Sequence, residues 1–232
     1  MIRSFAFNAL FYPALILFSL FLLVIFPFAS TPYIQKVASK WILFILNLLR
    51  IICGVDWRVE GRSNLPNGPC VIASNHQGPW ESLFIQTLLI PSSSVVKREL
   101  LLIPFFGWAV ATTKPIIINR SEKFKSLKKV IKAANKRISQ GFSIILFPEG
   151  TRVNPSEGVQ KFGSSCGVIS CKNKIPLVPV CHNSGKYWRN GKFKKYPGTI
   201  VVRIGAPISE ADPKKATNLA YNWVSNNYRE LY

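Results

Sequence analysis

Acidic and histidine side chains are scarce in this sequence of 232 residues, which limits the acid–base chemistry that the protein can perform. Histidine occurs only at His76 and His182, and aspartate occurs only at Asp56 and Asp212. Ten acidic residues stand against thirty lysines and arginines, so the formal net charge is +20. Such an excess favours a polyanionic partner, which is nucleic acid, an anionic membrane surface or a phosphorylated substrate.

The five cysteines are odd in number and scattered, so they do not form a disulfide framework and indicate a reducing compartment. Cys166, Cys171, Cys181 and His182 lack the close C-x-x-C pair of a typical zinc site, and we predict no metal site. The chain has no internal repeat or low-complexity linker. Its length suits one α/β domain with a short appendage.

An apolar run from Phe5 to Phe28 is long enough to cross the roughly 30 Å hydrocarbon core of a bilayer. It is longer than the hydrophobic region of a signal peptide, and no clear cleavage site follows it, so we expect it to be retained. A second stretch, Trp41 to Ile52, carries Asn47 and Arg50. This pattern is typical of an interfacial or re-entrant helix, or of the return leg of a hairpin. Residues 1–55 are therefore predicted to anchor the protein in a membrane, either spanning it or lying on it.

Basic residues are more frequent after the first apolar run than before it. Only Arg3 precedes the run, whereas Lys36, Lys40, Arg50 and Arg58 follow it. By the positive-inside rule, the globular part of the chain faces the cytoplasm.

From about residue 56, short apolar runs alternate with helix-like segments. This pattern predicts an α/β domain over residues 56–232, with a mixed, largely buried sheet flanked by helices. The candidate strands are Cys70 to Ser74, Pro115 to Ile118, Phe142 to Phe147, Leu177 to Cys181 and Thr199 to Ile204. The candidate helices are Pro79 to Ile90, Glu122 to Ser139 and Asp212 to Tyr228.

Two segments concentrate positive charge. The predicted helix from Glu122 to Ser139 has one apolar face and many lysines elsewhere, which indicates either a solvated face or contact with anionic lipid headgroups. The segment from Lys186 to Tyr196 mixes cations with aromatic residues. That mixture suits a membrane interface, but it also suits single-stranded nucleic acid.

The sequence NHQGPWE, from Asn75 to Glu81, follows a candidate strand. On one continuous helix His76 and Glu81 would lie about 140° apart. If the helix starts at Pro79, however, His76 stays in the preceding loop, and the loop can fold the imidazole back onto the carboxylate. A carboxylate on one ring nitrogen fixes the tautomer and leaves the other nitrogen free to accept a proton. A loop histidine that bonds only backbone and a helix-capping glutamate are the alternative interpretation.

The sequence FPEGTR, from Phe147 to Arg152, also follows a candidate strand. Gly150 permits an unusual backbone conformation, and Arg152 offers a planar fork for phosphate. Lys97 and Arg120 are further basic residues near strand ends, where α/β proteins bind ligands, and we predict that they contact phosphate. An ordinary strand-to-loop turn is the alternative interpretation of FPEGTR.

Together these segments resemble the glycerolipid acyltransferase family, specifically the bacterial 1-acylglycerol-3-phosphate (lysophosphatidate) acyltransferases. NHQGPWE looks like the first block of this family, in which a histidine is followed after four residues by an acid, usually aspartate. KRELLLIPFFGW through IIINR is similar to the second block, FPEGTR matches the third, and IPLVP matches the fourth. The resemblance runs from about Val71 to Pro207. Glu81 is the departure, because its extra methylene changes the reach toward His76.

The resemblance implies a catalytic role for two residues and acceptor binding for six others. The residues with an implied catalytic role are His76 and Glu81. Those with an implied role in acceptor binding are Lys97, Arg120, Glu149, Gly150, Thr151 and Arg152. It implies transfer of a fatty acyl group from acyl-CoA or acyl-carrier protein to the free hydroxyl of lysophosphatidate, at the bacterial inner membrane. Anionic membrane lipids are expected as partners and nucleic acid is not. With His76 as general base, the reaction needs no metal, cofactor or covalent enzyme intermediate.

Three alternatives remain open from the sequence. The acceptor can be another lysolipid, including an ornithine-type lipid. Residues Gly163 to Gly167 satisfy the G-x-S-x-G pattern of serine hydrolases, although the polar segment Asn154 to Phe162 is not the buried strand that this pattern requires. A membrane-tethered nucleic-acid-binding protein would explain the charge but would leave NHQGPWE and FPEGTR unexplained.

Overall fold

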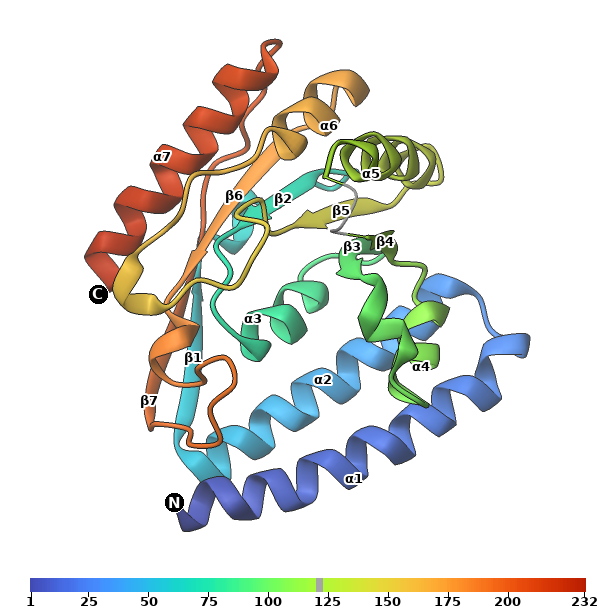
Figure 1. Ribbon diagram of the computed structural model, residues 1–232, viewed down its shortest axis with the longest axis vertical. Helices are drawn as coiled ribbons and strands as arrows, with labels where there is room; N and C mark the ends of the chain where they lie inside the picture. The colour runs from blue at the N-terminus through green and yellow to red at the C-terminus, as the bar shows by residue number, and fades with distance from the viewer. Residues whose placement is uncertain (120–122) are drawn as a thin grey trace.

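A mixed sheet forms the centre of the molecule. The computed structural model describes residues 1–119 and 123–232, with the side chains of helix α5 described from Leu127 onward. Within these residues the sheet has seven strands, and helices pack on both of its faces (Figure 1). The predicted α/β class, with a mixed and largely buried sheet, is therefore confirmed. The strands are β1 (Val55–Glu60), β2 (Val71–Ser74), β3 (Ser92–Lys97), β4 (Ile116–Ile118), β5 (Ser143–Leu146), β6 (Leu177–His182) and β7 (Gly198–Ile204).

The strand order is β1-β7-β6-β2-β5-β3-β4. The neighbouring strands β6, β2, β5, β3 and β4 run parallel. Strand β7 pairs antiparallel with β6, and β1 pairs parallel with β7. Because the carboxyl ends of parallel strands meet at one edge of a sheet, the segments that follow β6, β2, β5 and β3 gather along the same edge.

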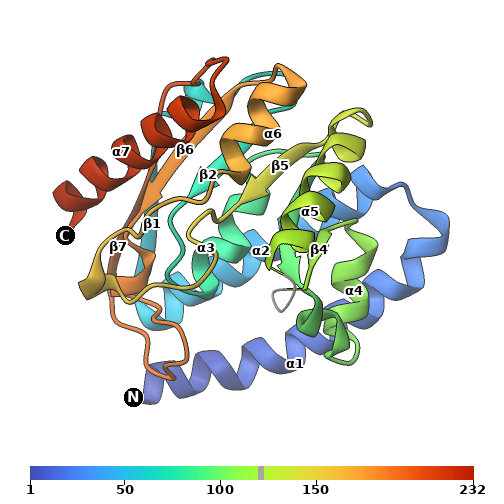
Figure 2. The same ribbon diagram turned by 45° about the horizontal axis from the view of Figure 1, so that its top comes forward.

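The helices form two layers. They are α1 (Ile2–Ile25), α2 (Thr31–Cys53), α3 (Pro79–Phe84), α4 (Phe106–Thr112), α5 (Lys123–Ile138), α6 (Ser165–Asn173) and α7 (Pro213–Leu231). Helices α2 and α3 cover one face with α1 outside them, whereas α5, α6 and α7 cover the other face (Figures 1 and 2). Alternate strand residues point to opposite faces, so Ile72 packs toward α2 while Val71 and Ala73 pack toward α6 and α7. Central strands that are apolar on both sides appear in the sequence as continuous hydrophobic runs.

The five strands predicted from these runs are all present, but the sequence does not predict β1 and β3. Strand β1 lies at the sheet edge and exposes polar side chains, and β3 begins with three serines. The helices α4 and α6 are also absent from the prediction. The predicted helix from Pro79 to Ile90 is shorter in the structure, since α3 ends at Phe84 and a 3-10 turn follows from Ile85 to Thr87.

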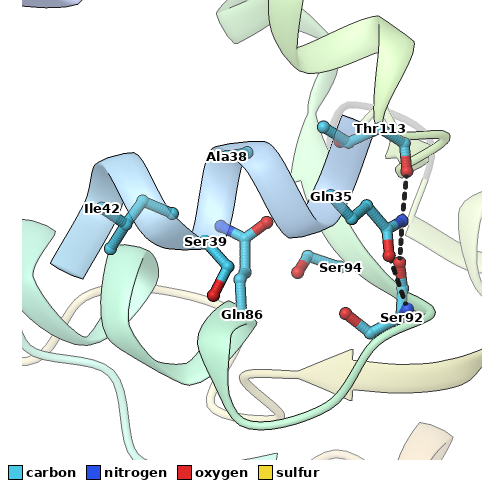
Figure 3. Close-up of a pocket in the computed structure, with 8 residues that line it drawn as sticks. All are labelled: Gln35, Ala38, Ser39, Ile42, Gln86, Ser92, Ser94 and Thr113. Atoms are coloured by element: carbon cyan, nitrogen blue, oxygen red, sulfur yellow. Dashed lines mark hydrogen bonds between the residues drawn. The ribbon is translucent and has the colours of Figure 1, made fainter. Parts of the chain in front are cut away.

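A glutamine of helix α2 stabilises the serine-rich start of β3 (Figure 3). Gln35 Nε2 donates hydrogen bonds to the carbonyl oxygens of Ser92 (2.7 Å) and Thr113 (2.9 Å), and Gln35 Oε1 accepts one from Ser92 N (2.9 Å). These bonds border a polar cavity of about 20 Å³ that Ser39 and Gln86 also line. A buried polar group without a hydrogen-bond partner lowers the stability of a protein by about 1–3 kcal/mol. The bonds of Gln35 therefore stabilise the packing of α2 against the sheet.

Helices α1 and α2 run antiparallel as a hairpin along one side of the domain (Figure 1). In the described chain, the segment Ile2–Phe28 is the one helix that is long and apolar enough to cross a membrane. Helix α2 contains the second apolar stretch and buries Ile45 and Leu49 in the core that also holds Ile72 of β2. The stretch from Trp41 to Ile52 therefore belongs to the return helix of a hairpin, and its inner side packs on the sheet layer.

Helix α1 contacts the α/β domain near both of its ends. Near its start, Asn8 Oδ1 accepts a hydrogen bond from Lys195 Nζ (2.6 Å), and the ring of Phe7 packs edge-on against Trp188. Near its end, Leu22 packs in a small cluster with Ala109 of α4. Its outer side carries exposed large apolar side chains, which include Phe5, Leu10, Leu17, Phe21 and Val24.

Candidate active site

Several of the segments predicted to be functional meet at the carboxyl edge of the parallel strands. The loop 75–78 follows β2, the loop 147–153 follows β5, and the turn 183–185 follows β6. Lys97 is exposed at the end of β3, which lies two strands from β2, or roughly 10 Å at the usual strand spacing. Arg120, which we predicted to bind phosphate, lies outside the described residues.

His76 and Glu81 are in contact across the start of α3. The helix begins at Pro79, so Glu81 lies in its first turn and His76 stays in the loop. His76 Nδ1 lies 2.9 Å from Glu81 Oε1. The ring of Phe147 stacks on the imidazole, with the ring centroids 4.1 Å apart and an interplanar angle of 18°. Among the described residues nothing forms a hydrogen bond to His76 Nε2, so this nitrogen is available to accept a proton.

The carboxylate of Glu81 is completely buried and fully hydrogen-bonded. Besides the contact with His76, Oε1 accepts hydrogen bonds from the backbone nitrogens of Gln77 (2.7 Å) and Gly78 (2.5 Å), and Oε2 accepts one from Ser184 Oγ (2.6 Å). Burial raises the pKa of a carboxyl group, but the hydrogen bonds from the His76 ring and the Gly78 N–H hold the pKa of Glu81 below its ordinary value. Glu81 is therefore ionised at neutral pH, and it caps α3 as well as pairing with His76.

The second histidine supports the loop and is not available as a base. His182 is completely buried, its Nε2 lies 2.8 Å from the carbonyl oxygen of Asn75, and its Nδ1 accepts a hydrogen bond from Ser184 N (3.3 Å). Burial lowers the pKa of His182, which favours the neutral ring. The Asn75 amide also donates to His182 O (2.9 Å) and accepts from His182 N (3.1 Å). These bonds fix the loop 75–78 to the end of β6.

Glu149 holds the backbone of His76. Its Oε1 accepts a hydrogen bond from His76 N (2.9 Å), and its Oε2 accepts one from Gln160 N (3.3 Å). On the other side of the same residue, Val153 N donates to His76 O (2.8 Å). Burial raises the pKa of Glu149 to about 7 in spite of the two N–H donors. The FPEGTR loop therefore supports the candidate base directly.

The last three residues of the FPEGTR motif are exposed beside the same site. Gly150 has a φ of +73°, a left-handed conformation that favours glycine. Thr151 and Arg152 are exposed, and Arg152 Nη1 donates a hydrogen bond to Asn190 Oδ1 (3.0 Å). A guanidinium group has five N–H donors, so this bond leaves Arg152 with further donors for a ligand.

The segment 186–196, called the basic loop below, packs directly on the loop 75–78. A Cβ atom at Gly78 would lie only 2.5 Å from the carbonyl oxygen of Trp188, so this position requires glycine. Through Lys195 and Trp188 the same loop contacts helix α1. The basic loop therefore lies between α1 and the candidate site.

Sequence reasoning missed three side chains that complete the site. They are Ser184, the stacking ring of Phe147, and Gln77, whose Nε2 donates to Tyr228 Oη (2.6 Å) and whose Oε1 accepts from Gly185 N (3.1 Å). The apolar segment that ends in HNSG indicates a strand that reaches the site. It gives no signal that a serine binds a glutamate about a hundred residues earlier.

The serine-hydrolase alternative lacks its structural context. Ser165, the central serine of the G-x-S-x-G pattern, begins helix α6. In the described chain a loop rather than a strand precedes it. The strand-turn-helix arrangement that exposes a nucleophilic serine is therefore not formed there.

The fold and the site define an α/β protein with a histidine–glutamate pair at the carboxyl edge of its sheet. A family model described as Acyltransferase matches residues 56–183. Over 219 residues the chain is 38% identical to the 1-acyl-sn-glycerol-3-phosphate acyltransferase of Pseudomonas aeruginosa. The alignment covers 92% of this chain and 84% of that relative. A Saccharomyces cerevisiae protein of the same name is 27% identical over 74% of this chain and 58% of its own length. The chain belongs to the acyltransferase family and is an enzyme.

The fold is shared with a solved structure. The crystal structure of the 1-acyl-sn-glycerophosphate acyltransferase of Thermotoga maritima matches with a TM-score of 0.82 and 20% sequence identity, covering 99% of this chain and 95% of that one. The family that the motifs indicate is confirmed by the family model and by the Pseudomonas aeruginosa relative. The nucleic-acid-binding alternative had no explanation for NHQGPWE and FPEGTR, whereas family membership accounts for both.

Replacing Glu149 by glutamine should reduce the pH dependence of stability. The Glu149 carboxyl group has a pKa of about 7 in the folded protein, against an ordinary value of 4.5. Between these two pH values the folded protein therefore binds more protons at this group than the unfolded protein does. The contribution of this group to stability is therefore lost as the pH rises from about 4.5 to about 7. Glutamine keeps an oxygen that can accept the His76 N–H, but it does not titrate.

The melting temperature of Glu149→Gln, measured between about pH 5 and pH 7.5, should fall less with rising pH than that of the parent. Glu157→Gln is the matched control, because this glutamate is exposed in the same loop region and should leave the slope unchanged. Equal slopes in the parent and Glu149→Gln would contradict the buried state of this carboxyl.

Proposed function

We propose that this enzyme transfers a fatty acyl group from an acyl thioester to the free hydroxyl of 1-acyl-glycerol-3-phosphate and so forms phosphatidic acid. The observation that carries the proposal is the pairing of His76 Nδ1 with the ionised Glu81 while Nε2 remains available, beside the FPEGTR loop. The names of the relatives in Pseudomonas aeruginosa and Saccharomyces cerevisiae support this acceptor. Both acyl-CoA and acyl-carrier protein are compatible donors.

In this mechanism His76 Nε2 removes the proton from the acceptor hydroxyl while the oxygen of that hydroxyl attacks the carbonyl carbon of the thioester. The new oxygen–carbon bond forms, the carbon–sulfur bond breaks, and the proton passes from the imidazolium to the leaving thiolate. Glu81 holds the Nδ1–H tautomer and stabilises the imidazolium that forms. Glu149 and Phe147 keep the imidazole in place through the backbone nitrogen and the ring face of His76.

The acceptor phosphate is proposed to bind on the exposed side of the FPEGTR loop. Arg152 provides the fork for phosphate, and Gly150 and Thr151 lie next to it. Lys97, at the end of β3, and Arg120, which follows β4, are proposed as further cationic contacts. Glu149 belongs to the same motif, and its two hydrogen bonds with backbone N–H groups support a role in shaping this region.

We further propose that residues 1–55 anchor the enzyme to a bilayer and that residues 56–232 carry the chemistry. The exposed apolar side of α1 is the surface that would enter the lipid, and Leu102, Phe105 and Trp108, near α4, add exposed apolar groups next to it. Since α1 contacts the domain near both of its ends, it is proposed to lie in one leaflet along the domain. The bacterial inner membrane, with the domain on its cytoplasmic side, is the location that the basic flanking residues favour.

Among the two basic segments, the basic loop is the better candidate for contact with anionic lipid. Lys195 of this loop is bonded to Asn8 of α1, and Arg189, Lys192 and Lys194 are exposed beside it. Helix α5, by contrast, packs on the face of the sheet opposite α1 and α2 (Figure 2). A membrane that covers α1 would therefore lie on the far side of the sheet from the lysines of α5.

The function is tested by incubating the membrane-bound enzyme with radiolabelled acyl-CoA or acyl-carrier protein and lysophosphatidate, and measuring labelled phosphatidate. His76→Ala should lower kcat by at least ~10²-fold, because a positioned general base is lost. Glu81→Gln should also be severe, since the amide cannot stabilise the imidazolium. Glu81→Asp should stay within about tenfold of the parent if the loop closes the shorter reach.

Melting temperature and the amount of membrane-bound protein control for folding in each variant, and Glu157→Gln serves as a surface glutamate control. If a folded Glu81→Gln enzyme keeps nearly full activity, the carboxylate only caps α3. If the parent acylates another lysolipid but not lysophosphatidate, the proposed acceptor is wrong.

Arg152→Ala should raise the KM for lysophosphatidate about tenfold or more and change the KM for the acyl donor little, as expected for one lost charge-assisted contact. Arg152→Lys should recover only part of the loss, because an ammonium group cannot form the bidentate fork. Arg62→Ala is the control, since Arg62 follows β1 and β1 runs opposite to the strands that end at the site. Equal effects on the two KM values would contradict the assignment.

Membrane attachment through α1 should resist both high salt and alkaline carbonate, because the apolar surface of α1 does not depend on charge. The measurement is the fraction of protein in the pellet after extraction and ultracentrifugation. Substituting the exposed Phe5, Leu17 and Phe21 by serine should move protein into the supernatant, whereas Lys192→Ala should not. Quantitative release of the parent by carbonate would show that the attachment is only peripheral.

A further inference from the structure

Ser184 reaches the oxygen of Glu81 that His76 does not use. Its hydroxyl lies 2.6 Å from Glu81 Oε2, whereas His76, Gln77 N and Gly78 N all contact Oε1. Both Ser184 and Glu81 are completely buried, so water does not compete for this bond. An ionised carboxylate only accepts hydrogen bonds, and the serine hydroxyl is therefore the donor.

The hydroxyl of Ser184 is held by the end of β6. Ser184 N donates to His182 Nδ1 (3.3 Å), and His182 is in turn bonded to Asn75 through its ring and its backbone. Ser184 begins a 3-10 turn that continues to Lys186, and Gly185 N donates to Gln77 Oε1. The serine therefore belongs to a set of bonds that joins the turn after β6 to the loop 75–78.

We propose that Ser184 is a positioning residue for acyl transfer. Its hydrogen bond to Oε2 of Glu81 fixes the orientation of the carboxylate, so that Oε1 stays directed at His76 Nδ1. The inference rests on the proposed catalytic roles of His76 and Glu81. Without the hydroxyl, a buried and unpaired Oε2 would favour rotation of the carboxylate toward other donors. Catalytic geometry tolerates little displacement, because a shift of about 1 Å in a positioned group can cost about a hundredfold in rate.

Glu81 contacts two separate segments at once. The carboxylate must contact the loop after β2 with one oxygen and the turn after β6 with the other. The side chain of Glu81, in the first turn of α3, reaches both.

A purely structural role for Ser184 makes a different prediction. If the hydroxyl only satisfies a buried oxygen, its loss should lower stability and leave the turnover of the folded enzyme unchanged. A positioning role should appear in kcat, with KM for both substrates unchanged, and it should disappear when the carboxylate of Glu81 is absent.

The experiment compares Ser184→Ala and Ser184→Cys with the parent. Ser184→Ala should lower kcat about tenfold without changing either KM, as expected for loss of one hydrogen bond to a charged group. Ser184→Cys should be intermediate, because a thiol has a similar shape but is a weaker donor. Ser170→Ala is the matched control: this serine is also buried and donates to Ile175 O (2.6 Å), but it lies on α6. Its loss should lower the melting temperature and keep kcat within about twofold.

The double variant Glu81→Ala/Ser184→Ala supplies the decisive measurement. If Ser184 acts through the carboxylate, its removal from Glu81→Ala should change kcat by less than about twofold. Losses that multiply in the double variant, or a kcat for Ser184→Ala equal to that of Ser170→Ala, would overturn the proposal. If Ser184→Ala does not fold, Ser184→Cys and its combination with Glu81→Ala carry the same test.

The parent, the single variants and the double variant are all measured with whichever lysolipid the parent acylates. A parent that is inactive on lysophosphatidate therefore refutes the proposed acceptor without affecting the comparison of variants. A Glu81→Ala enzyme with parental kcat refutes the proposed histidine–glutamate pair and the role of Ser184 together.

Discussion

The buried carboxylate of Glu81 is the constraint on which the candidate site depends. An ionised group without access to water is strongly unfavourable unless donors replace its hydration. Glu81 receives those donors from the loop 75–78 after β2 and from the turn after β6. Two loops therefore meet at one carboxylate in the first turn of α3, and the same contacts place the imidazole of His76.

The direction of the strands makes this meeting possible. Strands β6, β2 and β5 are neighbours and parallel, so the segments that follow them emerge side by side at one edge. The loop after β5 holds His76 through Glu149 and Phe147, and the turn after β6 holds it indirectly through Ser184 and Glu81. The loop 75–78 is therefore held both by its own bonds to Glu81 and by the loops on either side of it.

The N-terminal hairpin is part of the same construction. Helix α2 packs on the sheet and is fastened to β3 by Gln35, while α1 is bonded through Asn8 to Lys195 of the basic loop. The basic loop in turn packs against Gly78 and bonds Arg152. The helix proposed to enter the membrane and the loop proposed to bind the acceptor are therefore joined by a single intervening segment. This arrangement would hold the site close to a bilayer that contains the lipid substrate.

Local patterns in the sequence determined the central strands and the start of α3 at Pro79, because these features depend on continuous apolar runs and helix-start chemistry. The same patterns allowed the pairing of His76 with Glu81 but left a helix-capping glutamate as the alternative, and the contact in the structure decided between them. Strands β1 and β3 were beyond such reasoning, because each contains polar residues instead of a continuous apolar run, and the backbone at the start of β3 is held by the distant Gln35. Only the tertiary structure decided that Ser184 bonds Glu81, 103 positions away in the sequence, that Glu149 bonds the backbone of His76, and that α5 lies opposite α1. Contacts of this kind follow from strand order and direction, which bring distant segments to one edge of the sheet and which no short stretch of sequence encodes.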